Sequence, residues 1–480
     1  MTAKPAESES TKNSAGLDLV VVGGGPGGYV AAIRCGQLGL KTTIVEADRL
    51  GGTCLIRGCI PSKALIHVAG KFEAMREHVG SGKLGIKLDS PPQFDLGGAV
   101  DWKETVVDRL NGGVAALLKK AKVRVVHGKA VFADAKNCTV ATPEGEVAIS
   151  AEHVILATGS VVAGIPSIPY GEHVMSSTEA LLQRDLPKRL VVIGAGYIGM
   201  ELGIAYAKMG SEVVFVEALD RILTLFDRPL VKPVEAWLKQ HKVAVHLSTK
   251  AIGLVEDANG RALEVEAADG TRQRLACDKV LVAVGRRPAT QGWGLEKMAI
   301  DMNGPFVKVD DQCRTSMRNV WAIGDLIGEP MLAHKASAQG EMVAELIAGH
   351  RRSFNPVAIA AVCFTEPELV GAGLSPDEAK AKGIEVVVGQ FPFAANGRSL
   401  AMQAGTDGGF VRVTARADNH LVIGIHAVGA HVSELSGEFA LALEMGARLE
   451  DLSGTIHVHP TMTETLPEAA LAALGHAIHA

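Results

Sequence analysis

The sequence predicts an α/β protein in which two Rossmann-like dinucleotide-binding domains precede a C-terminal α+β domain. Three observations lead to this fold class. A strand, a glycine-rich turn, a helix and a second strand occur in this order twice in the chain. Both second strands end in a glutamate at the same spacing from the first glycine, Gly23 to Glu46 and Gly194 to Glu217. From about residue 356 the pattern changes to strands and then helices, without a third glycine-rich turn.

Each repeated unit begins with a short apolar strand of the kind buried in a parallel sheet. The first unit consists of a strand over residues 18–22, the turn Gly23-Gly-Gly25-Pro-Gly-Gly28, a helix and a strand over residues 41–46. The second consists of residues 189–193, the turn Gly194-Ala-Gly196-Tyr-Ile-Gly199, a helix and residues 212–217. Both turns fit G-x-G-x-x-G in the expected strand–helix context, which indicates two dinucleotide sites. The alternative is two parallel-sheet units that bind no ligand.

The chemistry of a dinucleotide site explains each residue of this pattern. The first glycine makes the tight turn, the second lets the backbone approach a pyrophosphate, and the third lets helix and strand pack closely. The helix N-terminus then offers free N–H groups to the phosphates. Glu46 and Glu217 are each predicted to bind a ribose. Because the Glu217 carboxylate would repel a 2′-phosphate, and Ala218 and Leu219 follow instead of Arg, NAD is favoured over NADP.

Composition limits the remaining possibilities. A chain of 480 residues is too long for one ordinary core. The net charge of −5 and the aromatic content of 4% argue against nucleic-acid binding. No run of about 20 apolar residues predicts a membrane helix. Residues 1–16 are predicted to be a mobile polar tail rather than a targeting segment, so we expect a cytoplasmic protein.

Further apolar strands that stop at glycine mark places where the chain can cross between domains. They are expected at residues 154–159 and 280–285, and a strand over residues 320–325 ends in Asp325. In the last domain, strands are expected at residues 409–414 and 421–425. The predicted domains are 17–157 and 158–288 for the two dinucleotide sites, 289–355 completing the first domain, and 356–480.

Two of the seven cysteines form a close pair, Cys54 and Cys59. The other five are isolated and predicted to be core residues: Cys35, Cys138, Cys277, Cys313 and Cys363. In a reducing compartment a close pair is more often catalytic than structural, and Gly58 and Pro61 help to shape a small ring. The alternatives are two ordinary cysteines or metal ligands. The C-x₄-C spacing without a second pair argues against zinc, and no metal is predicted.

Lys63 follows Cys59 by four residues, so a helix would place both side chains on one face. A cation there would favour a thiolate or an anionic reduced flavin. A solvent-facing lysine is the alternative.

The assembled motifs resemble the pyridine nucleotide-disulfide oxidoreductase family over nearly the whole chain from residue 17. They are Gly51-Gly-Thr-Cys54-x₄-Cys59-x-Pro-Ser-Lys63, Ala157-Thr158-Gly159, Ala322-Ile-Gly-Asp325 and His457-Val-His459-Pro-Thr-Met-Thr-Glu464, together with both glycine turns. The resemblance implies FAD at the first turn, NAD at the second, and a C-terminal interface (dimerisation) domain that forms a homodimer. One departure is Leu55-Ile-Arg57 between the cysteines, where the family has smaller or more polar residues.

The resemblance also implies individual roles. Asp325 would contact the ribityl chain of the flavin, and Glu201 would pair with Lys63 beside it. Tyr197 would lie where nicotinamide stacks, although it could equally be a packing residue. Thr158, Gly159 and Gly285 are further expected cofactor contacts.

His459 and Glu464 are the predicted acid–base pair. An imidazole is the side chain suited to take a thiol proton near neutral pH, and a carboxylate on its other nitrogen fixes the tautomer. His457 is not predicted to be catalytic. In this family the C-terminal histidine serves the disulfide of the partner subunit.

The positions of the cysteines, together with Glu217 and Ser62, argue against several other branches of the family. No cysteine follows Cys363, unlike in mercuric reductases and large thioredoxin reductases, and Glu217 and Ser62 differ from the pattern of glutathione reductases. The lipoamide branch is favoured, with lipoyl domains and the E2 core of a 2-oxo acid dehydrogenase complex as partners. The lipoyl group is expected on another chain. Which complex is served is left open, although residues 391–397 and 361–365 resemble the branched-chain type. Another disulfide reductase, such as glutathione reductase, or a non-catalytic flavoprotein subunit is the alternative.

Overall fold

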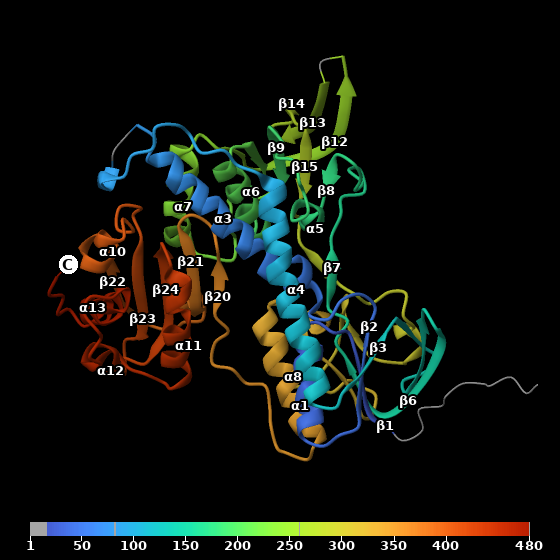
Figure 1. Ribbon diagram of the computed structural model, residues 1–480. Coiled ribbons are helices and arrows are strands. Elements are labelled where there is room, and N and C mark those ends of the chain that lie inside the picture. The colour runs from blue at the N-terminus through green and yellow to red at the C-terminus, as the bar shows by residue number, and fades with distance from the viewer. Residues whose placement is uncertain (1–16, 81–82, 259, 480) are drawn as a thin grey trace, which may run out of the picture. The chain divides into compact units, whose positions relative to one another are not determined.

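The computed structural model describes residues 17–80, 83–258 and 260–479 (Figure 1). The chain forms two compact units. Of the described residues, the first comprises those within 17–62, 101–163 and 286–355, and the second those within 63–100, 164–285 and 356–479. The predicted tail, residues 1–16, lies outside the described residues.

The first unit is built on a sheet with the order β3-β2-β1-β6-β5-β4, in which β19 also pairs with β6. Its strands are β1 (Leu17–Val22), β2 (Thr42–Glu46), β3 (Arg124–His127), β4 (Lys129–Phe132), β5 (Asn137–Thr142), β6 (Gly145–Leu156) and β19 (Val320–Ala322). The strands β1, β2, β3, β6 and β19 run parallel, whereas β4 and β5 form an antiparallel meander with β6. The unit also contains α1 (Pro26–Gln37), α2 (Gly52–Arg57), α8 (Ala333–Ile347) and most of α4 (Leu96–Lys120).

Burial on both faces explains why β1 is a continuous apolar strand. Leu19, Val20 and Val21 are fully buried, as expected for a parallel strand covered on both sides. Helices α1 and α8 lie side by side (Figure 1) because glycine lets their backbones approach. A Cβ atom on Gly340 of α8 would overlap the carbonyl oxygen of Gly27 in α1.

The second unit contains a parallel sheet with the order β11-β10-β9-β15-β8. Its strands are β8 (Val174–Met175), β9 (Arg189–Ile193), β10 (Glu212–Val216), β11 (Ala244–His246) and β15 (Lys279–Val282). Between β11 and β15, three antiparallel strands form a separate sheet: β12 (Thr249–Asp257), β13 (Gly260–Ala267) and β14 (Arg272–Ala276). The helices α3 (Cys59–Glu77), α6 (Tyr197–Met209) and α7 (Arg228–Gln240) contribute buried residues to one core with this sheet. Gly203 lets α6 lie against the ring of Phe215.

The same unit carries an antiparallel sheet with the order β20-β21-β24-β23-β22. Its strands are β20 (Ala361–Cys363), β21 (Glu368–Gly373), β22 (Val386–Pro392), β23 (Phe410–Arg416) and β24 (Val422–Gly429). Helices α11 (Ser436–Glu444), α12 (Leu449–Gly454) and α13 (Thr465–Ala473) contribute to its core, with Phe439 and Leu466 almost fully buried. The predicted α/β class with two dinucleotide-type sheets and a C-terminal α+β part is confirmed.

Three predicted strands end earlier than expected. β6 ends at Leu156, β15 at Val282 and β19 at Ala322. The glycines that close these segments explain the difference, because Gly159, Gly285 and Gly324 have φ angles of 71°, 117° and 72°. Such angles lie outside the extended region and end a strand. Asp325 therefore lies in a 3₁₀ turn, η3 (Gly324–Ile327), and not on a strand.

Candidate active site

The first glycine-rich turn joins β1 to α1, and close backbone packing fixes it. A Cβ atom on Gly23 would collide with the carbonyl oxygen of Ala157, and one on Gly28 with that of Gly23. Beside Gly25, however, the closest atom to an added Cβ is the Gly52 Cα at 4.0 Å. The Glu46 carboxylate accepts hydrogen bonds from the Gly24 N–H (2.5 Å) and the Asp48 N–H (2.8 Å). The first and third glycines are therefore required by packing, while a Cβ atom at the second would be accommodated without a clash.

The second turn, between β9 and α6, repeats this geometry. A Cβ atom on Gly194 would lie 2.5 Å from the carbonyl oxygen of Ala283, and one on Gly199 would overlap the carbonyl oxygen of Gly194. No other atom lies within 4 Å of a Cβ placed on Gly196. The Glu217 carboxylate accepts from the Ala195 N–H (2.7 Å) and the Leu219 N–H (2.9 Å).

Arg221 is the first arginine after Glu217, and its guanidinium donates to the carbonyl oxygens of Phe226 (2.7 Å) and Thr224 (2.8 Å). Tyr197 lies between the second and third glycines of the second turn, begins α6 and is partly buried against the core of this unit.

The chain leaves and re-enters the first unit through the paired strands β7 (Ser160–Val162) and β16 (Arg286–Pro288). Thr158 Oγ1 donates to the Ala289 carbonyl (3.1 Å), and the Ala289 N–H donates to the Gly159 carbonyl (2.9 Å). Ser160 Oγ donates to Asp325 Oδ2 (2.5 Å), and Arg286 Nε donates to Ser160 Oγ (2.7 Å). This network orients Asp325. Ser160 and Arg286 were not among the predicted residues, although Arg286 directly follows the predicted Gly285.

The two close cysteines lie at the start of two consecutive helices. Cys54 is in the first turn of α2 and is partly exposed, whereas Cys59 begins α3 and is exposed. The five isolated cysteines are all buried, as predicted. Gly51 and Gly52 have φ angles of 100° and 57°, and a Cβ atom on Gly52 would lie 2.6 Å from the Gly25 Cα. The segment that carries the two cysteines thus begins where Gly52 packs against Gly25 of the first glycine-rich turn.

Residues between and after the cysteines fix the local conformation. Gly58 lies too close to Thr53 for a side chain, since an added Cβ would be 2.9 Å from the Thr53 carbonyl oxygen. Arg57, part of the departure from the family pattern, forms an ion pair with Asp48 beyond the end of β2. Ser62 Oγ donates to the Cys59 carbonyl (3.0 Å).

Lys63 and Glu201 form the expected pair. Lys63 Nζ donates to Glu201 Oε2 at 2.7 Å, and the Glu201 side chain is only 4% exposed. The other carboxylate oxygen, Oε1, accepts from the Phe364 N–H at 3.0 Å. The ring of Phe364 lies under Lys63 Nζ, 4.6 Å from its centroid, which is a cation–π distance. Phe364 was not predicted, because no motif or periodicity marks it.

His459 and Glu464 are also in contact. His459 Nδ1 and Glu464 Oε1 are 2.9 Å apart, while Oε2 of Glu464 accepts from the Thr461 N–H (2.8 Å). Burial alone would raise the pKa of Glu464, but the Thr461 N–H and His459 outweigh it and hold this pKa below its usual value. The His459 side chain is 80% exposed, so its second nitrogen is open to a reactant. His457 instead contacts Glu438 Oε1 (2.7 Å) and the Thr455 carbonyl (2.9 Å), a structural arrangement.

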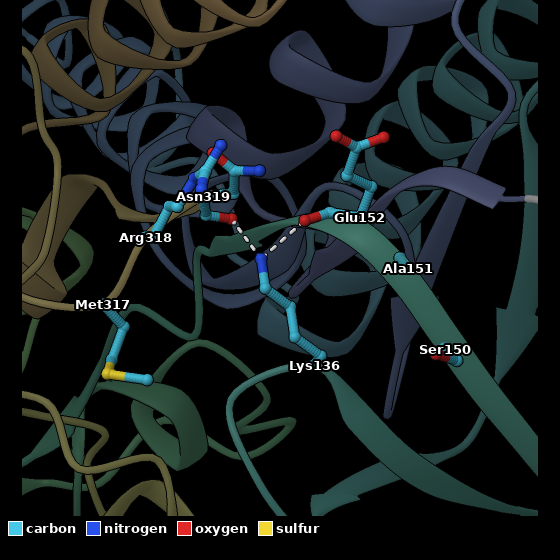
Figure 2. Close-up of a pocket in the computed structure, with 7 residues that line it drawn as sticks. All are labelled: Lys136, Ser150, Ala151, Glu152, Met317, Arg318 and Asn319. Atoms are coloured by element: carbon cyan, nitrogen blue, oxygen red, sulfur yellow. Dashed lines mark hydrogen bonds between the residues drawn. The ribbon is translucent and has the colours of Figure 1, made fainter.

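A separate pocket in the first unit contains none of the predicted site residues. Its lining is Lys136, Ser150, Ala151, Glu152, Met317, Arg318 and Asn319. Figure 2 shows the Lys136 amino group between two backbone carbonyl oxygens, those of Glu152 (2.5 Å) and Asn319 (2.9 Å). Lys136 thus ties β6 to the segment before β19. Within the described ranges, no three His, Cys, Asp or Glu side chains gather as a metal site, and no helix is long and apolar enough to span a membrane.

Comparison with known proteins decides the family. Residues 17–340 match the pyridine nucleotide-disulphide oxidoreductase family, and residues 359–470 match its dimerisation domain. The chain belongs to the pyridine nucleotide-disulphide oxidoreductase family. A dihydrolipoyl dehydrogenase of Pseudomonas aeruginosa is 58% identical over 462 residues, covering 96% of this chain and 98% of that protein. One from Geobacillus stearothermophilus is 44% identical, with coverage of 96% and 97%.

Solved structures agree with this family membership. The crystal structure of LpdA from Mycobacterium tuberculosis has a TM-score of 0.86 at 25% identity and covers 95% of this chain and 99% of its own. A flavoprotein disulfide reductase, RclA from Escherichia coli, has a TM-score of 0.82 at 25% identity, with coverage of 94% and 99%. The match to the dimerisation domain supports a homodimer.

Family membership brings FAD and NAD(H) as cofactors, and the residues present fit them. Both turns have a second glycine beside which an added Cβ meets no clash and a glutamate at the end of the following strand. This is the arrangement that admits a pyrophosphate and a ribose.

Proposed function

We propose that this chain is a dihydrolipoyl dehydrogenase, which oxidises protein-bound dihydrolipoamide to lipoamide with NAD⁺ as the final electron acceptor. The observation that carries the proposal is the packing of Gly52 on Gly25, because it begins the Cys54–Cys59 segment at the first dinucleotide turn. The His459–Glu464 contact adds an acid–base pair suited to a dithiol substrate. The 58% identity to the Pseudomonas aeruginosa dihydrolipoyl dehydrogenase supports this choice of substrate.

The predicted site residues divide between the two cofactors. We assign to FAD the residues Gly23, Gly25, Gly28, Glu46, Lys63, Thr158, Gly159, Glu201 and Asp325. We assign to NAD the residues Gly194, Gly196, Tyr197, Gly199, Glu217 and Gly285. When bound, FAD supplies an acceptor for the electron pair of the dithiol and returns that pair to NAD⁺ as hydride.

The residues of the chain account for the thiol chemistry, starting from a Cys54–Cys59 disulfide. His459 accepts a proton from one substrate thiol, and the resulting thiolate attacks the sulfur of Cys54. This step forms a mixed disulfide, breaks the Cys54–Cys59 bond and leaves Cys59 as a thiolate. The second substrate sulfur then attacks the substrate sulfur of the mixed disulfide and passes its proton to the departing Cys54 sulfur, so that lipoamide leaves with Cys54 as a thiol, Cys59 as a thiolate and His459 protonated. The substrate is oxidised by two electrons and the cysteine pair is reduced by two.

The partners follow from the same proposal. We propose that the exposed His459 acts on the disulfide of the partner subunit of a homodimer. Neighbouring apolar side chains, Ile456 at 98% and Val458 at 73% exposure, give this segment a surface for such a contact. We further propose that lipoyl domains and the E2 core of a 2-oxo acid dehydrogenase complex supply the substrate in the cytoplasm. We also propose that the domains meet at the boundaries predicted from the sequence, residues 157, 288 and 355.

A comparison of rates tests the proposed substrate and cofactor together. The purified dimer is assayed with dihydrolipoamide and NAD⁺, and with oxidised glutathione and NADPH. Turnover with dihydrolipoamide and NAD⁺ should exceed turnover with oxidised glutathione and NADPH by orders of magnitude. Faster reduction of glutathione would assign the chain to another disulfide reductase, and no turnover with either would indicate a non-catalytic flavoprotein.

Cofactor choice is predicted to depend on Glu217. Replacing Glu217 by Arg should raise KM for NAD⁺ and lower KM for NADP⁺, because the carboxylate that accepts from a ribose and repels a 2′-phosphate is replaced by a cation. Steady-state kinetics with both nucleotides measures the change. Glu212→Arg, at the exposed start of the same strand, is the control and should leave the preference unchanged. A native preference for NADP⁺ would refute the role of Glu217.

The open space beside Gly196 gives a second prediction. Gly196→Ala should fold normally but weaken NAD⁺ binding by about 1–3 kcal/mol, the usual cost of overpacking, since its methyl group would meet only the nucleotide. Gly199→Ala is the contrasting variant, because its Cβ would overlap the Gly194 carbonyl oxygen and should lower the thermal stability. Thermal unfolding and NAD⁺ titration separate the two effects. Equal loss of stability in both variants would contradict this interpretation of the turn.

A further inference from the structure

A buried lysine lies near the end of α6, two turns beyond Glu201. The Lys208 side chain is only 7% exposed, and its Nζ lies 3.0 Å from Glu73 Oε2 of α3 and forms an ion pair with Glu366. Burial alone would lower the pKa of Lys208, but Glu366 and Glu73 outweigh burial and raise it above its usual value. Lys208 is therefore a charged group that two carboxylates hold in place.

The surroundings of Lys208 restrict it further. His241 Nε2 lies 3.5 Å from Glu73 Oε1, and the His241 ring stacks on Trp237 with 3.9 Å between centroids. Lys208 Nζ lies 5.7 Å from the centroid of the Trp237 ring. The lysine thus joins α3, α6 and α7 to the loop that carries Glu366.

That loop, residues 364–367, also touches the Lys63–Glu201 pair. At its start, Phe364 donates its N–H to Glu201 and places its ring under Lys63. Two residues later, Glu366 contacts Lys208. Between them, Thr365 is buried and its hydroxyl donates to the Pro367 carbonyl (2.7 Å). The loop is therefore held at both ends by α6.

Two ion pairs join α3 to α6, and the helix that carries the cation differs between them. In the first, Lys63 of α3 meets Glu201 of α6, and in the second, Glu73 of α3 meets Lys208 of α6. Glu201 and Lys208 are seven residues apart, so they project from nearly the same face of the helix. A displacement of the loop at Glu366 must be transmitted to Phe364, because only Thr365 separates them.

We propose that Lys208 is a positioning residue for the redox reaction: by holding Glu366 and Glu73 it fixes Phe364, and through Phe364 the geometry of the Lys63–Glu201 pair. This inference rests on the proposed function, in which Lys63 acts on the flavin and the reduced sulfur. Lys208 itself touches no reacting atom.

The test measures the reduction potential of the bound flavin in the FAD-loaded dimer. Lys63→Met should lower this potential, because a cation that favours the anionic reduced flavin is removed. Lys208→Met should lower it in the same direction by a smaller amount, and should reduce kcat by roughly 3- to 30-fold with little change in KM. Lys208→Arg, which keeps the charge, should restore most of both losses.

The control is an ion pair elsewhere in the same unit whose cation is as buried as Lys208. Arg412 and Asp227 are 6% and 8% exposed and 2.5 Å apart, and they join β23 to the start of α7. Arg412→Met should lower the unfolding temperature without moving the flavin potential. If Lys208→Met behaves in the same way, the role of Lys208 is structural only and the inference is overturned.

One further variant, together with the result for Lys63→Met, keeps the outcomes separate. If Lys208→Met does not fold because two carboxylates are left unpaired, Glu366→Gln removes one charge while keeping an acceptor. Glu366→Gln should lower the flavin potential, and an unchanged potential would overturn the inference. If instead Lys63→Met leaves the potential unchanged, the proposed role of Lys63 fails, and the inference fails with it.

Discussion

Replacement of His459 by Gln is expected to lower turnover with dihydrolipoamide by roughly 10²–10⁴-fold, the usual contribution of a general acid–base residue. The amide keeps the size of the ring but cannot take up the thiol proton. Electron transfer from NADH to an artificial one-electron acceptor should survive, because that reaction bypasses the dithiol. Comparing these two assays in one enzyme preparation measures the effect.

Glu464→Gln should lie between wild type and His459→Gln. The carboxylate is 2.9 Å from His459 Nδ1 and its pKa lies below its usual value, so it is ionised at neutral pH and can support an imidazolium. The lowered pKa of Glu464 also determines how the folding stability changes with pH. A lowered pKa in the folded protein stabilises it above the pKa of the unfolded chain, and this contribution is lost as pH falls through the folded value.

The double variant tests whether the two residues act as one unit. Groups that work together are not additive, so His459→Gln combined with Glu464→Gln should lose far less than the product of the single losses. His476→Gln, an exposed histidine near the C-terminus, is the control and should retain turnover. Fully multiplicative losses would show that His459 and Glu464 act separately.

The fold could be predicted because its signals are local. The turns at Gly23 and Gly194 need glycine for backbone reasons that operate within one βαβ unit, and Glu46 and Glu217 lie at fixed offsets from them. His459 and Glu464 are five residues apart, so their contact also depends on a short segment. Strand ends were predicted less well, since Gly159, Gly285 and Gly324 take up positive φ a few residues after the last ladder pair.

Other parts of the site depend on contacts between distant segments. Phe364 meets Glu201 across 163 residues, and Lys208 meets Glu366 across 158. No local pattern indicates either contact, and a lysine near a helix end is ordinarily solvated. Lys208 is buried because α3, α7 and the 364–367 loop converge on the same end of α6, where α3 and the loop provide carboxylates and α7 provides the Trp237 ring. The roles of Phe364 and Lys208 therefore become visible in the tertiary structure and not in the sequence.

The two cysteines are predicted to have different roles that absorption spectra can separate. Both Cys54→Ser and Cys59→Ser should abolish lipoamide turnover, with losses on the order of 10⁴–10⁶-fold, as when a covalent nucleophile is removed. The spectra should differ. In Cys54→Ser, Cys59 has no disulfide partner and can be a thiolate beside oxidised flavin, which should give a long-wavelength charge-transfer band without added reductant.

Cys59→Ser should show no such band, because Cys54 is the sulfur that exchanges with substrate. The structure favours this division, since Cys59 begins α3, the helix that carries Lys63 one turn later, and a nearby cation lowers a thiol pKa. Cys54→Ser combined with Lys63→Met should therefore show a weaker band at the same pH. Cys138→Ala, at a buried cysteine of β5, is the control and should show neither the band nor the loss of turnover. Equal spectra for Cys54→Ser and Cys59→Ser would mean that neither sulfur is reserved for the flavin, and the proposed order of attack on Cys54 would have to be given up.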